Sequence, residues 1–255
     1  MTRNDVLKIA LDQSAADIGC APWDFLREDN VVVRSEIGPK ARAYYKEPIA
    51  CNLVSYGNNI VASVKDEYRD LVTEYIGKFD WHSCFETPNL HWLDDRLLPF
   101  GQRVCFMAEY FLPDPGKIKK QSCPYRVERL GAEDFRDLYK PEWSNALCEK
   151  RKELDLLGFG AYDGETLVGL AACSKDCETM YQIGVDVLFA YRQKGIASAL
   201  TSRLSRAVLD LGKVPFYCAA WSNLRSVKNA LKCGFFPAWV ELTAKPAAFV
   251  AEMNE

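Results

Sequence analysis

Residues 184–200 read GVDVLFAYRQKGIASAL, and this stretch decides the fold of the half of the chain around it. Its first part, through Phe189, is apolar and β-branched, which predicts a buried strand. Its last part, from Ile196, has apolar residues at helical spacing, which predicts the start of a helix. Between the two lie Arg192, Lys194 and Gly195. A strand that enters a helix through two cations and a glycine indicates an anion-binding junction.

The start of this expected helix has the chemistry of a phosphate site. The first amides of a helix have no partners within the helix, and its dipole places partial positive charge at the same end. Gly195 would let a phosphate approach the backbone without a Cβ in the way. Arg192 and Lys194 would add charge beside the amides of Gly195, Ile196 and Ala197. We interpret the junction as a pyrophosphate cradle; the alternative is a loop with two solvated cations and a terminating glycine.

Composition limits the class of protein. The chain has 255 residues, 49% hydrophobic and 12% aromatic, so it can bury a sizeable core. Its formal charge of -3 excludes an overall basic field for nucleic acid or an anionic membrane. The first residues carry charges where a signal peptide needs apolar ones, and no stretch has the ~18 apolar residues that cross a bilayer, so we expect a cytoplasmic protein. The 10 cysteines form no C-x-x-C pair, which favours free thiols.

Residues 1–115 predict a separate N-terminal α+β domain. Strands are expected within residues 30–36, 48–64 and 103–112. The helical pattern of residues 63–79 begins at Ser63, a predicted N-cap with Asp66 three residues on. A second helix is expected from Thr87, whose hydroxyl would cap it while Pro88 takes the first helical position. Two prolines and a glycine then introduce the expected linker, residues 116–123.

Residues 124–255 predict a second, α/β domain. Segments in which apolar residues recur every two residues alternate with segments in which they recur every 3.6 residues, and this order indicates a mixed sheet flanked by helices. The expected strands are residues 125–130, 158–173 (a hairpin turning at Asp163-Gly164), 180–189, 214–221 and 235–244, and the expected helices are residues 194–212 and 223–234, with one or two more within 132–154.

The C-terminal half resembles the GCN5-related N-acetyltransferase (GNAT) superfamily. Residues 192–197, RQKGIA, satisfy that family's acetyl-CoA motif, R/Q-x-x-G-x-G/A, and follow the expected strand. Asn223 stands the usual distance ahead of Gly234 and Phe235, as in the family's other cofactor-contacting segment. The resemblance covers about residues 124–245. It implies a GNAT mixed sheet, acetyl-CoA as cosubstrate, and direct acetyl transfer to a primary amine with no covalent enzyme intermediate.

The resemblance also implies roles for individual residues. Val187 would offer its backbone amide to the thioester carbonyl and the developing oxyanion. Asn223 and Ser226 would contact the pantetheine, although Asn223 also suits a plain helix N-cap and Val187 an ordinary strand residue. The pyrophosphate would be held by Arg192, Gln193, Lys194, Gly195, Ile196 and Ala197.

Proton transfer is where the family pattern is incomplete. Many relatives carry a tyrosine at the position of Ala230, where it protonates the departing thiolate. The proton donor would then be Ser226, Tyr217, Cys218 or water, or the thiolate would leave unassisted. Asp186 is the first candidate for the general base that a protonated amine needs. The alternatives are Glu178, Tyr181 and Glu241.

The acceptor is left open by the sequence. An amine-bearing small molecule and a protein lysine both fit, no nucleic-acid or membrane partner is expected, and the oligomeric state is open, with a homodimer as one option. A catalytically silent acyl-CoA-binding sensor or scaffold is the main rival, because Ala230 replaces the tyrosine. Residues 1–115 would contribute to the acceptor site or dock a protein substrate.

A second cluster of reactive side chains lies between His82 and His91 and includes Cys84 and Glu86. Its spacing fits no closed zinc site, so neither a metal nor covalent catalysis is expected. We expect this aromatic segment to pack against the catalytic half or to line the acceptor pocket.

Overall fold

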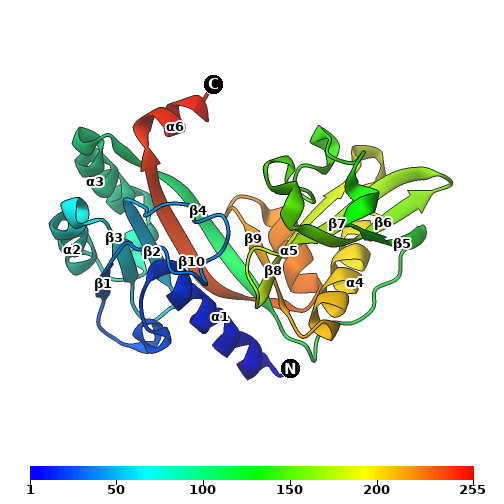
Figure 1. Cartoon of the computed structure of the whole chain (residues 1–255), viewed down its shortest axis with the longest axis horizontal. Coiled ribbons are helices and arrows are strands. Elements are labelled where there is room, and N and C mark those ends of the chain that lie inside the picture. Colours follow the sequence, from blue (N-terminus) through cyan, green and yellow to red (C-terminus); the bar gives the residue numbers. More distant parts are fainter. The chain divides into compact units, whose positions relative to one another are not determined.

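The computed structural model describes all 255 residues, which form two compact units interleaved along the chain (Figure 1). Unit 1 comprises residues 1–10 and 111–237, and unit 2 comprises residues 11–110 and 238–255. The chain passes between the units within helix α1 (Arg3–Ile18) and strands β4 (Gln102–Pro113) and β10 (Phe235–Pro246). The limits of the two units therefore do not coincide with the linker expected at residues 116–123. Residues 238–255, which were expected in the C-terminal domain, are part of unit 2.

Unit 1 is built on a mixed sheet with the strand order β9-β8-β7-β6-β5. Neighbouring strands are antiparallel, except that β8 and β9 are parallel. Helix α4 (Ile196–Asp210) makes the crossover that a parallel pair requires. The strands are β5 (Arg126–Gly131), β6 (Asp155–Asp163), β7 (Thr166–Ser174), β8 (Met180–Val187) and β9 (Val214–Ala219). The predicted mixed sheet with flanking helices is confirmed.

Helix α4 covers one face of this sheet and contacts β6, β7, β8 and β9 (Figure 1). Gly169 allows the close approach, because a Cβ there would lie 2.6 Å from the Ile196 side chain. The helix ends before Gly212, which has a φ of 74°. Helix α5 (Leu224–Lys232) adds Ala230 to the same core. The face of α4 that is buried in the core carries Ile196, Leu200, Leu204 and Val208 at intervals of four residues.

The helices predicted within residues 132–154 do not form. The segment contains three 3-10 turns, η5 (Ala132–Phe135), η6 (Pro141–Trp143) and η7 (Glu149–Leu154). Pro141 has no backbone N–H and so interrupts an α-helix. Phe135, Trp143 and Leu147 bury their side chains in a small core with Leu170 and Ala172 of β7. The apolar spacing of this segment therefore reflects anchoring of turns rather than a helix face.

The expected linker at residues 116–123 packs onto unit 1. Ile118 is buried in the main core of this unit, while the lysines beside it are exposed. Gly234, with a φ of 89°, lies so close to the segment that a Cβ would come within 2.8 Å of the Lys117 backbone. Residues 117–120 are expected from sequence to be a solvated part of this linker, and Ile118 is the residue among them that is buried instead.

Unit 2 contains α-helices beside a sheet with the order β1-β3-β2-β10-β4, as the α+β pattern predicts. Strand β2 is antiparallel to both β3 and β10, and β1 is parallel to β3. Its core joins side chains of the sheet to those of α2 and α3, including Tyr75, Leu93 and Leu97. Its elements are η1 (Pro22–Leu26), β1 (Val31–Arg34), β2 (Cys51–Ser55), β3 (Val61–Val64), η2 (Asp66–Tyr68), α2 (Arg69–Lys78), η3 (Ser83–Phe85), α3 (Thr87–Leu97), η4 (Leu98–Phe100) and α6 (Ala247–Glu252).

Two helix starts in unit 2 differ from the prediction. Ser63 lies within β3, opposite Asn52, and is 3% exposed, so it caps no helix. Helix α2 begins at Arg69, after the turn η2. Helix α3 begins at Thr87 as predicted, but its N-cap is Glu86 and no side chain makes a cap hydrogen bond. Strand alternation thus continues through Ser63 where a capping pattern was expected.

Two further expectations concern the whole chain. All 10 cysteines are free, as the absence of C-x-x-C pairs predicts. None of the helices has both the length and the apolar character needed to span a bilayer.

Candidate functional site

Strands β8 and β9 separate part of the way along β8. Their parallel register ends at the pair Gln182 and Phe216, yet β8 continues to Val187 and β9 to Ala219. On its other side β8 stays paired with β7 from Gln182 to Val187 without a register shift. The β9-facing edge of β8 beyond Gln182 is therefore unpaired with β9. We call residues 183–187 along this side the open edge of β8.

The backbone of Val187 points toward the open edge. Leu188 N donates to Val168 O at 3.0 Å, so the peptide groups of Leu188 face β7. Because neighbouring residues of a strand direct their N–H and C=O groups to opposite edges, those of Val187 face away from β7. Arg192 Nε donates to the Val187 carbonyl at 3.1 Å from that side. The Val187 amide thus has the direction that an oxyanion donor requires.

The loop from β8 to α4 has an unusual backbone. After the turn η8 (Phe189–Tyr191), Gln193 has a φ of 64° and Gly195 a φ of 82°. Gly195 is the N-cap of α4 and no side chain caps the helix, so its first amides keep free N–H groups. A Cβ on Gly195 would meet no atom within 4 Å. The N-terminus of α4 is therefore open, and an anion fits there.

The two cations of the motif are exposed but held by neighbours. Lys194 Nζ donates to the Tyr125 hydroxyl at 3.2 Å and lies 4.9 Å from the centre of the Tyr191 ring. The Arg192 guanidinium lies 5.4 Å from the centre of the Phe189 ring. These contacts place both charges beside the α4 N-terminus, which favours an anion site over freely solvated cations.

Asn223 is the N-cap of α5. Its Oδ1 accepts a hydrogen bond from Ser226 N at 3.2 Å, so the plain capping interpretation holds. Capping occupies only the oxygen, and the side-chain NH₂ group retains two donors for a pantetheine carbonyl. Asn223 can therefore cap the helix and bind a ligand at once.

Tyr217 of β9 lies beside the missing tyrosine's position. The side chains of Ser226 and Asn229 lie beside its hydroxyl. Burial raises the pKa of Tyr217 above its usual value, although these two side chains act to lower it, so the phenol is protonated at neutral pH. Ala230, one turn further along α5 than Ser226, is completely buried. Tyr217 and Ala230 are part of the same core, and Ser226 lies one turn before Ala230 on α5.

Asp186 is occupied by structural hydrogen bonds. Its carboxylate accepts from Asn145 N at 2.8 Å, Asn145 Nδ2 at 2.7 Å and Ala146 N at 2.9 Å. The same loop presses on β8 so closely that a Cβ on Gly184 would lie 1.7 Å from Asn145 O. Since the unbroken register preserves strand alternation, Asp186 faces away from the side of Val187. These contacts favour a role in holding the loop rather than in proton abstraction.

The other candidate bases are not gathered at the open edge either. Glu178 is exposed and paired with Lys175 at 2.8 Å, and Tyr181 is buried in the core of unit 1. Glu241 is part of unit 2. Cys84, between the two histidines, is buried, which raises the pKa of its thiol to about 12. No group of three or more His, Cys, Asp or Glu side chains could hold a metal ion.

The family of this segment follows from comparison with known proteins. The model of the family described as GNAT acetyltransferase matches residues 114–238, which contain the open edge of β8, the α4 N-terminus and α5. This segment of the chain belongs to the GNAT superfamily, which is a family of acetyltransferases. No curated protein matches the chain.

Several solved structures are similar to the chain. A GCN5-related N-acetyltransferase-like protein from Streptococcus suis is 20% identical over 60% of this chain and 68% of its own, with a TM-score of 0.44. A GCN5-related N-acetyltransferase from Kribbella flavida is 16% identical over 65% and 66%, with a TM-score of 0.43. An acetyltransferase from the GNAT family from Colwellia psychrerythraea is 15% identical over 78% and 82%, with a TM-score of 0.44. The chain thus spans about two thirds of the first two relatives' length.

Proposed function

We propose that this protein is an N-acetyltransferase that moves the acetyl group of acetyl-CoA directly to a primary amine. The observation that carries the proposal is the open edge of β8, which ends next to the uncapped N-terminus of α4. A strand edge offers backbone hydrogen bonds to an extended pantetheine chain, and a helix N-terminus offers its amides to a pyrophosphate. The motif RQKGIA supplies this second part in the family that matches the segment.

In this proposal the residues of the motif hold the cosubstrate. The amides of Gly195, Ile196 and Ala197 donate to phosphate oxygens, and the charges of Arg192 and Lys194 lie beside them. Gln193, in a left-handed conformation, turns the backbone so that the loop can curve around the anion. The side-chain NH₂ of Asn223 and the hydroxyl of Ser226 face the pantetheine from α5.

The proposed reaction involves few side chains directly. The amine nitrogen forms a bond to the thioester carbonyl carbon, the carbon–sulfur bond breaks, and the proton that the amine releases passes to water. The Val187 N–H donates to the carbonyl oxygen as it gains negative charge, a contribution of a few kcal/mol in comparable sites. Ser226 O–H then protonates the departing thiolate, and Ser226 recovers a proton from the neighbouring Tyr217 phenol, which water reprotonates. The acceptor is a small-molecule amine or a protein lysine.

Calorimetric titration of acetyl-CoA and of free CoA into the whole protein tests the first step. We expect micromolar binding of both, because the pyrophosphate contacts are common to them. Incubation with acetyl-CoA and a panel of amines, with products detected by mass, tests the transfer. Mass detection avoids the interference that 10 protein thiols would cause in a thiol-release assay. Absence of binding would refute the proposed cradle.

The second candidate is a catalytically silent acyl-CoA-binding sensor or scaffold. One observation favours it, because the buried Ala230 stands where many relatives carry the proton-donating tyrosine. Tight CoA binding without an acetylated product from any amine would support the sensor. Acetylation of even one amine at a rate that depends on Ser226 or Tyr217 would support the enzyme.

A further inference from the structure

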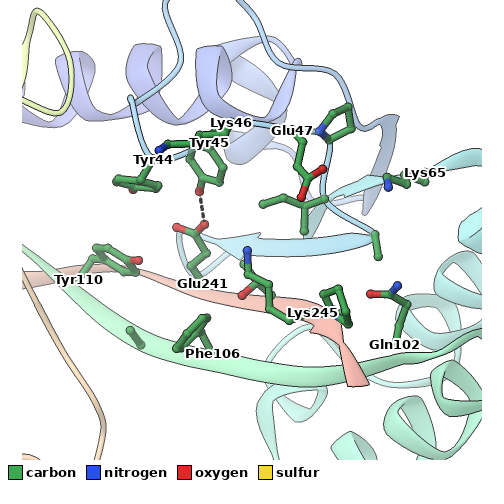
Figure 2. A pocket seen from close by; sticks show the side chains of 17 residues that line it. Tyr44, Tyr45, Lys46, Glu47, Lys65, Gln102, Phe106, Tyr110, Glu241 and Lys245 are labelled. Carbon is green, nitrogen blue, oxygen red and sulfur yellow. Dashed lines mark hydrogen bonds between the residues drawn. The ribbon is translucent and has the colours of Figure 1, made fainter. Parts of the chain in front are cut away.

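A pocket of about 510 Å³ lies within unit 2 (Figure 2). None of the residues of the acetyl-CoA motif lines it. One wall is a face of strands β4 and β10, from which alternate side chains point into the pocket. The opposite wall is the segment of residues 44–50. The strands contribute Gln102, Phe106, Ala108 and Tyr110 from β4 and Glu241, Thr243 and Lys245 from β10.

The deepest charged group in this pocket is the carboxylate of Glu241, which is 6% exposed. It is positioned by two donors, Tyr45 Oη and Asn52 Nδ2, the latter at 3.0 Å. Both donors bond to Oε1, so Oε2 is available to a ligand. Figure 2 shows the Glu241 side chain reaching across the pocket to Tyr45. A carboxylate removed from water and held in place in this way is arranged to meet a cation or another donor.

The surroundings keep Tyr45 as a donor to Glu241. Burial and the neighbouring Glu241 raise the pKa of Tyr45 well above its usual value, so its phenol is protonated. The nearby buried cation, Arg42, is already paired with Asp17 at 2.5 Å. The Thr243 hydroxyl, on the same face of β10 as Glu241, is buried without a hydrogen-bond partner. This wall therefore holds a fixed carboxylate, Glu241, next to a hydroxyl group, that of Thr243, without a hydrogen-bond partner.

The remaining lining has two features that define the ligand. Aromatic rings of Tyr44, Phe106 and Tyr110 border the pocket, and such rings favour an organic ammonium group over a hydrated metal ion. Lys46, Lys65 and Lys245 also line it, and Lys245 is half-buried on the same strand face as Glu241. The pocket thus presents an anion at its buried end, and three lysines with one exposed carboxylate, Glu47, elsewhere.

We propose that this pocket binds a small zwitterion, with its ammonium group at Glu241 and its anionic group at Lys245. The two residues are four positions apart on β10, or roughly 13 Å of strand at ~3.3 Å per residue. The flexible Lys245 side chain is about 6 Å long, so the ligand's charges are separated by roughly 7–13 Å, depending on how far the lysine leans along the strand. Linear ω-amino acids and short peptides have this dimension. The proposal concerns unit 2 alone and stands whether or not the acetyl-CoA site is active.

The test uses 6-aminohexanoate, whose charges lie about 7 Å apart when it is extended, with hexylamine and hexanoate as probes that each lack one charge. Ligand-observed NMR titration of the full chain measures the three dissociation constants. We expect 6-aminohexanoate to bind at millimolar concentration or below, and each singly charged probe to bind at least about tenfold more weakly. Failure of 6-aminohexanoate to bind at about 20 mM, or equal binding of all three, would overturn the proposal.

Two variants locate the charges. Glu241→Gln keeps an acceptor for Tyr45 and should weaken 6-aminohexanoate by about tenfold while leaving hexanoate unchanged. Lys245→Gln should weaken it similarly while leaving hexylamine unchanged. Glu74→Gln, at an exposed position of α2, is the matched control for loss of a carboxylate and should change nothing. If Glu74→Gln weakened the binding of 6-aminohexanoate as much as Glu241→Gln does, the assignment would be overturned. If Glu241→Gln does not fold, the comparison of the three probes on the unaltered protein decides whether the proposal holds.

Discussion

Gly195 at the N-terminus of α4 offers a substitution that separates charge from shape. Its φ of 82° favours glycine, so any other residue costs about 1–2 kcal/mol of folding stability. For a chain of 255 residues this corresponds to a fall in Tm of roughly 3–6 °C. No atom lies within 4 Å of the added Cβ, so the Cβ itself meets no steric barrier in the free protein. Gly195→Glu and Gly195→Gln should therefore fold with nearly equal, slightly reduced stability.

The two variants should differ sharply in their affinity for acetyl-CoA. A carboxylate on residue 195 would lie on the order of 5 Å from the bound pyrophosphate, and the repulsion of one charge pair is then about 3 kcal/mol at an effective dielectric constant of 20. This energy corresponds to roughly a hundredfold weaker binding in the Glu variant than in the Gln variant. The difference should shrink as salt is added, because mobile ions screen exposed charges.

Calorimetric titration of both variants with acetyl-CoA measures this difference, and thermal unfolding confirms that each is folded. Acetyl-pantetheine, which lacks the pyrophosphate, is the control ligand and should bind the Glu and Gln variants equally. If two folded variants bound acetyl-CoA with the same affinity, the pyrophosphate would not lie at the α4 N-terminus, and the reasoning from the helix end would be refuted.

Three further predictions address the backbone donor, the proton donor and a buried acid. Val187→Pro removes an N–H that does not pair with β7, so it should keep acetyl-CoA binding but lower kcat by about a hundredfold or more, and steady-state kinetics that show no loss would remove Val187 from the mechanism. Tyr217→Phe should lower kcat with little change in CoA affinity, while Asn229→Ala, which leaves both Tyr217 and Ser226 in place, serves as the control. Asp155 is 4% exposed, and burial raises its pKa from 3.8 to about 6, so the folded protein binds more protons than the unfolded chain between these values and its stability falls as pH rises. Denaturant unfolding at pH 4 and pH 7 should show that this group contributes at most about 3 kcal/mol to the fall, and Asp155→Asn should remove that contribution; an unchanged pH dependence would contradict it.

Local sequence patterns determined the elements around the candidate cofactor site. The apolar run before Val187 forms β8, the helical spacing from Ile196 forms α4, and the Asp163-Gly164 hairpin turns with Gly164 at a φ of 59°. These features depend on side chains within a few residues of one another, because periodicity and turn chemistry are local properties. The family motif lies at such a local junction, which is why the sequence placed the proposed anion site.

Features that depend on distant partners required the tertiary structure. Alternation along β10 predicts a strand, but the same alternation suits any sheet. Only the pairing of β10 with β2 shows that its residues from 238 onward are part of unit 2. By sequence alone Asp186 is a candidate general base, but in the structure the loop of Asn145 occupies its carboxylate with hydrogen bonds. The segment before β6 forms 3-10 turns because its apolar side chains bury against β7.

The pocket of unit 2 is the clearest product of tertiary structure. Residues 44–50, alternate residues of β4 and the end of β10 meet there, and they are separated by more of the chain than any local pattern spans. Glu241 was considered from sequence only as a general base on a late strand. Its partners Tyr45 and Asn52 come from the other end of the chain, so its burial and hydrogen bonds arise only when β10 pairs with β2. The sequence by itself determined the elements and the motif, and long-range strand pairing decided which side chains share a site.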